Sequence, residues 1–96
     1  MNYRNKKILE LARDMPCQSC GLLDGTVVAC HSNNLRDGKG TGIKSHDFRV
    51  AYLCHRCHDE IDNGTKLSRE ERKAKWEDAH RETIGLLFLN DHIKII

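Results

Sequence analysis

Hydrophobic positions in the N-terminal half of the chain change from a helical to a strand-like pattern. Apolar residues share one helical face within residues 3–13, which predicts a short helix that ends before Pro16. Residues 26–30 and 48–53 are short runs rich in β-branched and aromatic side chains, which is typical of strands. Residues 32–45 are polar and rich in glycine, and loops of this length are usually functional or disordered. The pattern therefore predicts one helix and two strands that a long, flexible loop connects.

The C-terminal half has the pattern of two helices. Residues 55–62 predict a short helix directly after the second strand. Ser68 followed by Glu71 fits a capping box at the start of a longer helix over about 68–92. Apolar residues from Trp76 onward keep helical spacing. We expect this last helix to supply most of the apolar packing.

The size of the chain limits the core that it can build. Residues 1–96 are expected to form a single domain, and a hydrophobic content of 39% with 5% aromatic residues leaves a thin core. A covalent link or a metal ion is therefore expected to help hold the fold together. The net charge of +2, from 16 basic and 14 acidic residues, excludes an overtly basic nucleic-acid coat. The chain has neither the ~18-residue apolar run of a membrane span nor a recognisable secretory signal, so we expect a cytoplasmic protein with no membrane partner.

The cysteines are arranged as ligands of a single metal ion. Four of the five form C-x-x-C pairs, Cys17 with Cys20 and Cys54 with Cys57. In a reducing compartment thiolate–metal bonds are favoured over disulfides. Each pair can turn two thiolates toward one ion, and four thiolates are a common closed set for zinc. The spacing predicts a structural Zn²⁺ that pins both ends of the strand pair, with a redox-active pair as the weaker alternative.

Four of the six histidines lie close to these cysteines in sequence. If the two strands pair and the short helix packs across them, His31 and His58 could face one another. One imidazole would then act as general base toward a water, and the other would hold a divalent cation near a phosphate. Two alternatives stay open, because His58 could replace a cysteine at the zinc and His31 could be an ordinary strand-end histidine. We assign no role to His55, and we expect His80 and His92 to be surface or capping residues.

Three segments of the chain carry a resemblance to a known group of enzymes. Residues 28–33 (VACHSN), 38–47 (GKGTGIKSHD) and 53–62 (LCHRCHDEID) resemble the HNH (ββα-metal) endonuclease superfamily. More closely, the chain is similar to a family of small prophage-encoded nucleases. The resemblance covers about residues 17–62. It implies an α+β fold in which a zinc-stapled ββα-metal core is flanked by N- and C-terminal helices.

The resemblance also implies roles for individual residues. His31 takes the position of the histidine that activates water, and His58 that of the final metal-binding histidine. Cys30 stands where the superfamily typically has an Asp, His or Glu that binds the catalytic metal. His46 and Asp47 occupy the region of the middle asparagine, so either could orient His31 or supply a metal ligand. The two C-x-x-C pairs match the structural zinc ligands of many HNH proteins.

The expected function is hydrolysis of DNA phosphodiester bonds at one divalent cation, Mg²⁺, Mn²⁺ or Zn²⁺. A non-catalytic zinc module that binds DNA or a protein is the first alternative, and a nuclease active only with a phage recombination partner is the second. The apolar stretches 86–89 and 93–96 could bury such a partner or a second copy of the chain, although packing onto its own core is the simpler expectation. Five basic residues around the loop and the second strand are candidates for phosphate contacts: Arg36, Lys39, Lys44, Arg49 and Arg56.

Overall fold

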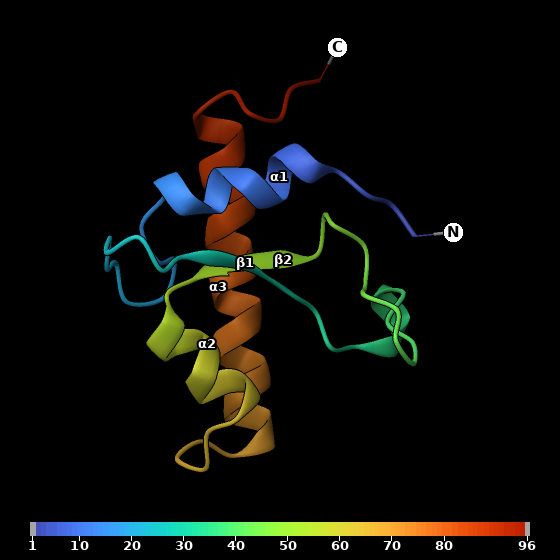
Figure 1. Cartoon of the computed structure of the whole chain (residues 1–96), viewed down its shortest axis with the longest axis vertical. Coiled ribbons are helices and arrows are strands. Elements are labelled where there is room, and N and C mark those ends of the chain that lie inside the picture. The colour runs from blue at the N-terminus through green and yellow to red at the C-terminus, as the bar shows by residue number, and fades with distance from the viewer. Residues whose placement is uncertain (1, 96) are drawn as a thin grey trace.

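The computed structural model describes residues 2–95 and places a small sheet between helices (Figure 1). Met1 and Ile96 lie outside the described residues, so the apolar end expected at 93–96 is described as far as Ile95. The α+β class is confirmed. In chain order the elements are α1 (Lys6–Leu11), a 3₁₀ turn (Ala12–Asp14), β1 (Val28–His31), a second 3₁₀ turn (Leu35–Asp37), β2 (Val50–Leu53), α2 (His55–Asp62) and α3 (Arg69–Leu89).

The two strands form an antiparallel ladder in which Val28 pairs with Leu53 and His31 with Val50. The sequence pattern placed the first strand at 26–30 and the second at 48–53, so both observed strands begin two residues later. Thr26 lies outside the ladder, and its side-chain hydroxyl, rather than its backbone carbonyl, accepts a hydrogen bond from the backbone N–H of His55 at 3.1 Å. The ladder thus starts opposite the second cysteine pair.

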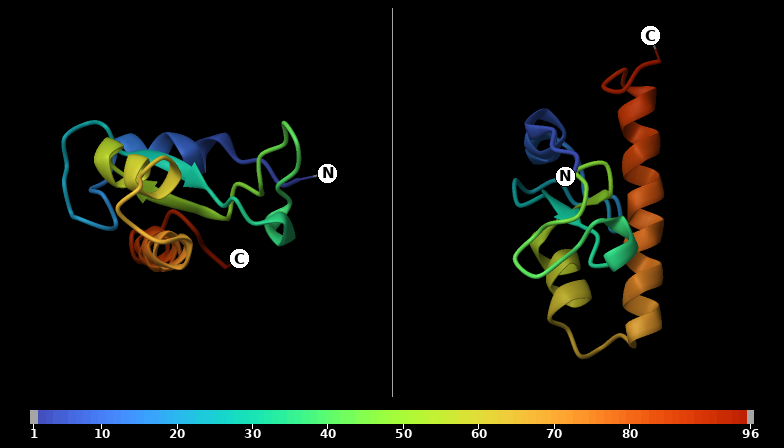
Figure 2. Two further views of the ribbon diagram at one scale, coloured as in Figure 1. Left: turned by 90° about the horizontal axis from the view of Figure 1, so that it is seen from below. Right: turned by 90° about the vertical axis from the view of Figure 1, so that its right-hand side faces the viewer.

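The long helix α3 crosses the two strands and contacts β2 at its open edge (Figure 1 and Figure 2). The backbone N–H of Tyr52 donates to Thr83 Oγ1 at 2.9 Å, and His80 Nδ1 donates to the carbonyl of Val50 at 2.7 Å. These side chains form hydrogen bonds with backbone groups on the outer edge of β2 that would otherwise be unpaired. The expectation that His80 is a surface or capping residue is therefore wrong, since its ring is half-buried, bonded to β2 and stacked on Trp76 at 5.2 Å.

The boundaries of α3 follow from local chemistry at each end. The predicted capping box is confirmed: Ser68 Oγ accepts from the N–H of Glu71 at 3.1 Å, and Glu71 Oε1 accepts from the N–H of Ser68 at 2.8 Å. The helix ends at Leu89 rather than near residue 92. The backbone N–H of His92 donates to Leu87 O at 2.8 Å, which turns the chain back.

On the other side of the sheet, α1 packs against β1, and the Tyr52 hydroxyl donates to the carbonyl of Ile8 (Figure 2). This helix is shorter than the predicted 3–13 because Asn5 caps it, with its side-chain oxygen accepting from Lys7 N and Ile8 N. Residues 2–5 are therefore left outside the helix. They lie along the loop that precedes β2.

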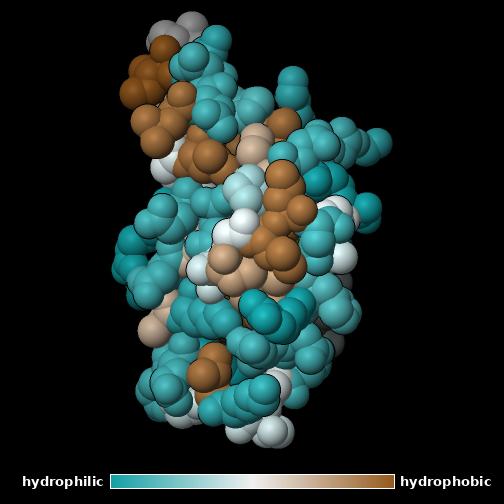
Figure 3. All heavy atoms as spheres, turned by 90° about the vertical axis from the view of Figure 1, so that its left-hand side faces the viewer, coloured by the Kyte–Doolittle hydropathy of each residue, from teal (hydrophilic) through white to brown (hydrophobic). Residues whose placement is uncertain are grey.

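Apolar side chains gather on the surface near the C-terminal end of the molecule (Figure 3). Leu87 is fully buried, as expected of a helix packed on its own core, but Leu89 is 84% exposed and Ile95 is 93% exposed. The predicted homodimer or phage partner at this end stays a prediction. Among residues 2–95, no helix combines the length and the apolar character that crossing a membrane would require.

Candidate functional site

The four paired cysteines converge on one point. The sulfur atoms of Cys17, Cys20, Cys54 and Cys57 all lie within 4.8 Å of one another, and the Cys20 and Cys54 sulfurs are 3.7 Å apart. Four sulfurs at the usual Zn–S distance of a tetrahedral site would be separated by about 3.8 Å. The tight turn at Gly21, which has a φ of 80°, helps to bring the first pair together. The cluster therefore fits a structural zinc ion.

The electrostatics of the cluster also fit a cation. Burial opposes ionisation of Cys17, but backbone N–H groups at Cys20, Cys54 and Ser19 lower its pKa to about 6. At Cys57, burial and then hydrogen bonds with the neighbouring thiols raise the pKa to about 12. One thiolate forms readily, whereas further ionisation is opposed unless a cation neutralises the charge. His58 lies outside this set, so its alternative assignment as a zinc ligand gains no support.

His31 and Asp47 form a hydrogen-bonded pair at the end of the strand ladder. His31 Nε2 lies 2.8 Å from Asp47 Oδ1, and the two side chains are 14% and 2% exposed. Asp47 also accepts from Arg4 Nη1 at 3.1 Å and from the N–H of Asn5 at 2.7 Å. Burial alone would raise the pKa of Asp47, but the hydrogen bonds from His31 and Asn5 and the Arg4 charge lower it. The ionised carboxylate accepts the Nε2–H of His31, so in the neutral form of this imidazole the lone pair is on Nδ1.

Residues 2–5 hold this part of the loop in place. Arg4 Nη1 donates to Ser45 O at 2.6 Å and Nη2 donates to Lys44 O at 2.7 Å. Asn2 Nδ2 donates to Gly38 O at 2.6 Å and to Lys44 O at 2.8 Å. A Cβ at Gly38 would lie 2.7 Å from the Asn2 side chain, so glycine is needed for this close approach. Sequence analysis missed Arg4, because nothing in a polar N-terminus signals a contact some forty residues away.

His46 makes different contacts from its neighbour Asp47. Its Nδ1 accepts from the backbone N–H of Tyr3 at 3.0 Å, and its ring stacks on Phe48 with centroids 4.7 Å apart. Of the two residues expected to orient His31, Asp47 is the one that bonds to it. A role for His46 in catalysis stays a prediction.

A second histidine–carboxylate pair lies on α2. His58 Nε2 is 2.6 Å from Asp62 Oδ2, and the side chains are 38% and 36% exposed. Asn33 Nδ2 donates to the other Asp62 oxygen at 3.4 Å. Asp62 was missed by sequence analysis, although its i, i+4 spacing from His58 on the predicted helix 55–62 could have identified it. His31 and His58 bond to separate carboxylates rather than to a shared one.

The structure places Cys30 in the hydrophobic core. Its side chain is 5% exposed, its thiol donates to Val28 O at 3.7 Å, and burial raises its pKa to about 12. Its carbonyl accepts from Trp76 Nε1 at 3.0 Å. Within residues 2–95, the four-cysteine cluster is the one group in which three or more His, Cys, Asp or Glu ligand atoms lie together. The assignment of Cys30 to a catalytic metal stays a prediction.

Of the five basic residues expected to contact phosphate, one is already bound to carboxylates, and the role of the others stays a prediction. Arg49 is engaged inside the protein, where its Nη2 pairs with Glu77 and lies 3.0 Å from Asp37 Oδ2. Its guanidinium also lies 4.9 Å from the centroid of the Trp76 ring. Arg36, Lys44 and Arg56 are exposed and Lys39 is partly exposed.

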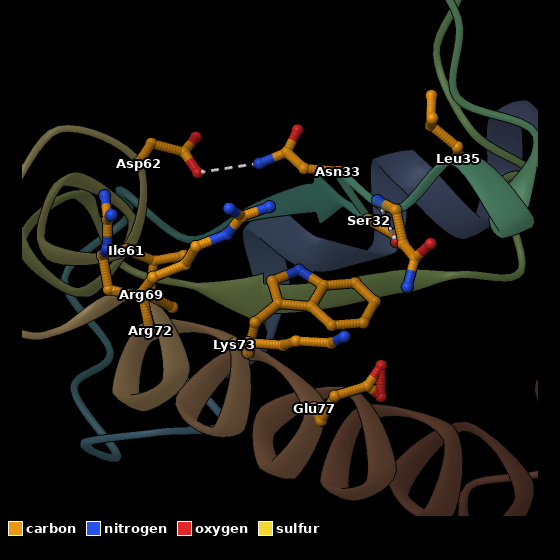
Figure 4. A pocket seen from close by; sticks show the side chains of 11 residues that line it. Ser32, Asn33, Leu35, Ile61, Asp62, Arg69, Arg72, Lys73 and Glu77 are labelled. Atoms are coloured by element: carbon orange, nitrogen blue, oxygen red, sulfur yellow. Dashed lines mark hydrogen bonds between the residues drawn. The ribbon is translucent and has the colours of Figure 1, made fainter.

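A cavity of about 480 Å³ opens between the start of α3, the end of α2 and the segment after β1 (Figure 4). Arg69, Arg72 and Lys73 enter it from α3, and Asn33 and Asp62 lie on the opposite rim. The remaining lining residues are Ser32, Asn34, Leu35, Ile61, Trp76 and Glu77.

Comparison with known proteins relates most of this structure to one family. A family model described as "Putative nuclease YbcO" matches residues 6–89. That span includes both cysteine pairs, both histidine–carboxylate pairs and α3. No curated protein and no solved structure matches the chain.

Proposed function

Because the chain belongs to the YbcO nuclease family, we propose that it is a metal-dependent endonuclease that hydrolyses DNA phosphodiester bonds by HNH-type chemistry. The observation that carries this proposal is the His31–Asp47 pair. A buried, ionised carboxylate that also accepts from Arg4 and Asn5 holds one imidazole in a defined tautomer. That arrangement suits general-base catalysis.

In the proposed reaction His31 is the general base. Asp47 accepts the Nε2–H, so Nδ1 is the atom that takes a proton from the attacking water. Asp47 acts through His31 as a positioning residue, and Arg4 in turn positions Asp47. The proton transfer needs no charge relay to Asp47, because the carboxylate only stabilises the imidazolium that forms.

His58 and Asp62 are proposed to hold the catalytic cation. Asp62 lies 2.6 Å from His58, whereas Cys30 is in the core and Asp47 is engaged with His31. An imidazole and a carboxylate one helical turn apart can both face one ion, with water and phosphate oxygens as its other ligands. A divalent cation held there would stabilise the negative charge that develops on the phosphate.

The proposal also gives the cysteine cluster a structural role. A zinc ion joining Cys17 and Cys20 to Cys54 and Cys57 would fix the start of α2, on which His58 lies. Thiolate–zinc sites are typical of reducing compartments, so we propose a cytoplasmic site of action. The prophage origin of the gene is proposed from the sequence resemblance alone. Lys44, which is exposed, and Lys39, which is partly exposed, remain candidates for DNA contacts from the loop.

Plasmid cleavage tests the function directly. Purified protein is incubated with supercoiled plasmid and Mg²⁺, Mn²⁺ or Zn²⁺, alongside His31→Ala, His58→Ala and the control His92→Ala, which changes an exposed histidine outside both pairs. We expect metal-dependent cutting that is lost in the first two variants, retained in the control, and accompanied by about one zinc per chain in all four proteins.

A non-catalytic zinc module is the second candidate. It is favoured by the finding that, among residues 2–95, no group of three close ligand atoms other than the cysteine cluster is present to receive a second cation. Zinc-loaded, folded protein that binds DNA but cuts no plasmid, single strand or branched DNA with any of the three ions would establish this reading.

A further inference from the structure

We propose that the cavity between α2, α3 and the segment after β1 binds the phosphate backbone of a DNA strand through Arg69, Arg72 and Lys73 (Figure 4). The inference rests on the proposed nuclease function and identifies where its substrate lies. Asp62 belongs both to the cavity wall and to the pair with His58. A strand in the cavity therefore passes directly beside the proposed cation ligands.

The three cations differ from other basic residues on the same helix. Within residues 2–95, Arg69, Arg72 and Lys73 form no ion pair. Lys75 and Arg81, by contrast, each bind a carboxylate, at 2.7 and 2.9 Å. Basic side chains without carboxylate partners thus gather where the cavity opens, which is the arrangement that an anionic ligand requires.

Arg72 carries a second, independent sign of a missing ligand. Its Nε–H is buried and donates to no acceptor among the described residues. An unsatisfied buried donor costs about 1–3 kcal/mol. A small shift of the Arg72 side chain toward a bound phosphate would give this N–H an acceptor, and the planar guanidinium suits phosphate better than an ammonium does.

The acidic residues that line the cavity are already engaged. Glu77 is bound to Arg49, and Asp62 accepts from Asn33 in addition to its contact with His58. Glu71, in the first turn of α3, is used in the capping box. The helix N-terminus adds a partial positive charge to the same end of the cavity. Among the described residues, the acidic groups of the cavity are therefore paired while its basic groups are not, and this difference favours the binding of an anion.

Direct binding measurements test the site without relying on catalysis. Fluorescein-labelled 16-nucleotide single-stranded DNA and the matching duplex are titrated by anisotropy, with no added divalent cation and at several salt concentrations. The variants are Arg69→Gln/Lys73→Gln, in which both side chains are exposed, and Arg72→Gln. The matched control is Lys7→Gln/Arg13→Gln, which removes two exposed charges on the opposite side of the sheet. Zinc content and thermal unfolding are measured for each protein.

We expect Arg69→Gln/Lys73→Gln to weaken binding about tenfold at 100 mM salt, and to lower the slope of log K against log salt by about 1–2. Arg72→Gln should weaken binding as well, and the control should stay within about twofold of the parent. Equal losses in the control, unchanged affinity in the cavity variants, or no binding by the parent protein would each overturn the site. A parent that binds through the cavity yet never cuts DNA would instead overturn the nuclease proposal alone.

Discussion

The two histidine–carboxylate pairs in this molecule are built in different ways. His31 and Asp47 are 16 positions apart, and the Asp47 side chain is 2% exposed and accepts from two donors in the N-terminal segment. His58 and Asp62 are one helical turn apart, and both side chains are more than a third exposed. A pair assembled from distant segments is held rigidly by the fold. A pair on one helix keeps its spacing locally and, under the proposed function, would give up its hydrogen bond to hold a cation.

Removing a zinc ligand should disrupt both histidine–carboxylate pairs. Cys57→Ser takes away a ligand at the start of α2, and the loss of a structural zinc, worth about 10–16 kcal/mol, is as large as the whole ~5–15 kcal/mol stability of a typical domain. We expect zinc-free, largely unfolded protein, measured by metal analysis and circular dichroism. Cys30→Ala is the control, because it removes a core thiol outside the cluster and should retain zinc. Stoichiometric zinc with a native melting temperature in Cys57→Ser would contradict the structural role.

Changing Asp47 should destabilise the protein strongly. Asp47→Asn removes a buried charge that binds His31, Arg4 and the backbone of Asn5, and breaking such a buried network costs about 3 kcal/mol. Urea denaturation at pH 7 measures the loss. Plasmid cleavage should also disappear, because the His31 tautomer is no longer selected. A variant with parental stability would show that Asp47 is not the centre of this network.

A third histidine shows the effect of burial without a carboxylate partner. Burial lowers the pKa of His80, and the nearby Arg49 charge lowers it further. The hydrogen bond to the Val50 carbonyl and the charges of Glu77 and Asp37 raise the pKa, but the net shift is downward. The unfolded chain therefore binds the proton more readily, so stability should fall as pH drops below about 6.5, the ordinary histidine pKa. Urea denaturation between pH 7.5 and 5.5 should show a flatter profile for His80→Gln than for the parent. If stability depended on pH equally in the parent and in His80→Gln, His80 would not be a source of the pH dependence.

Changing Asp62 should affect stability least of all. Asp62→Asn alters an exposed i, i+4 pair worth about 0.5 kcal/mol or less, so the urea midpoint should barely move. Cleavage should nevertheless be lost if Asp62 holds the cation, and partial recovery at higher Mn²⁺ would indicate a weakened ion site. Destabilisation as large as that of Asp47→Asn would erase the contrast between the two pairs.

Features that depend on neighbouring residues were predictable from the sequence. The C-x-x-C spacing, the helix at 55–62 and the capping box of Ser68 and Glu71 each rest on contacts within a few positions. Helix ends set by more distant contacts were less predictable. The helix expected over 3–13 is shortened because Asn5 caps it while residues 2–5 bind the loop.

The sequence alone could name candidates for the site but could not assign their contacts. His46 and Asp47 were equivalent candidates beside His31, because both lie at a turn before β2, where the N–H of Arg49 donates to His46 O, and no periodic pattern separates their side chains. The N-terminal segment decides between them, since Tyr3 binds His46 while Arg4 and Asn5 bind Asp47. Similarly, the sequence named Arg49 as a candidate for phosphate contacts but could not indicate that Asp37 and Glu77 bind it.

The sequence by itself indicated the two C-x-x-C pairs and the short helix that carries His58, because spacing within one or two turns defines each of them, and the α+β class followed from the resemblance. Only the tertiary structure decided that Asp47 holds His31, that Cys30 lies in the core, and that Arg72 lines a cavity with Asp62. Those contacts join residues far apart in the chain. They are set by the packing of α1 and α3 on either side of the sheet, which no local pattern encodes.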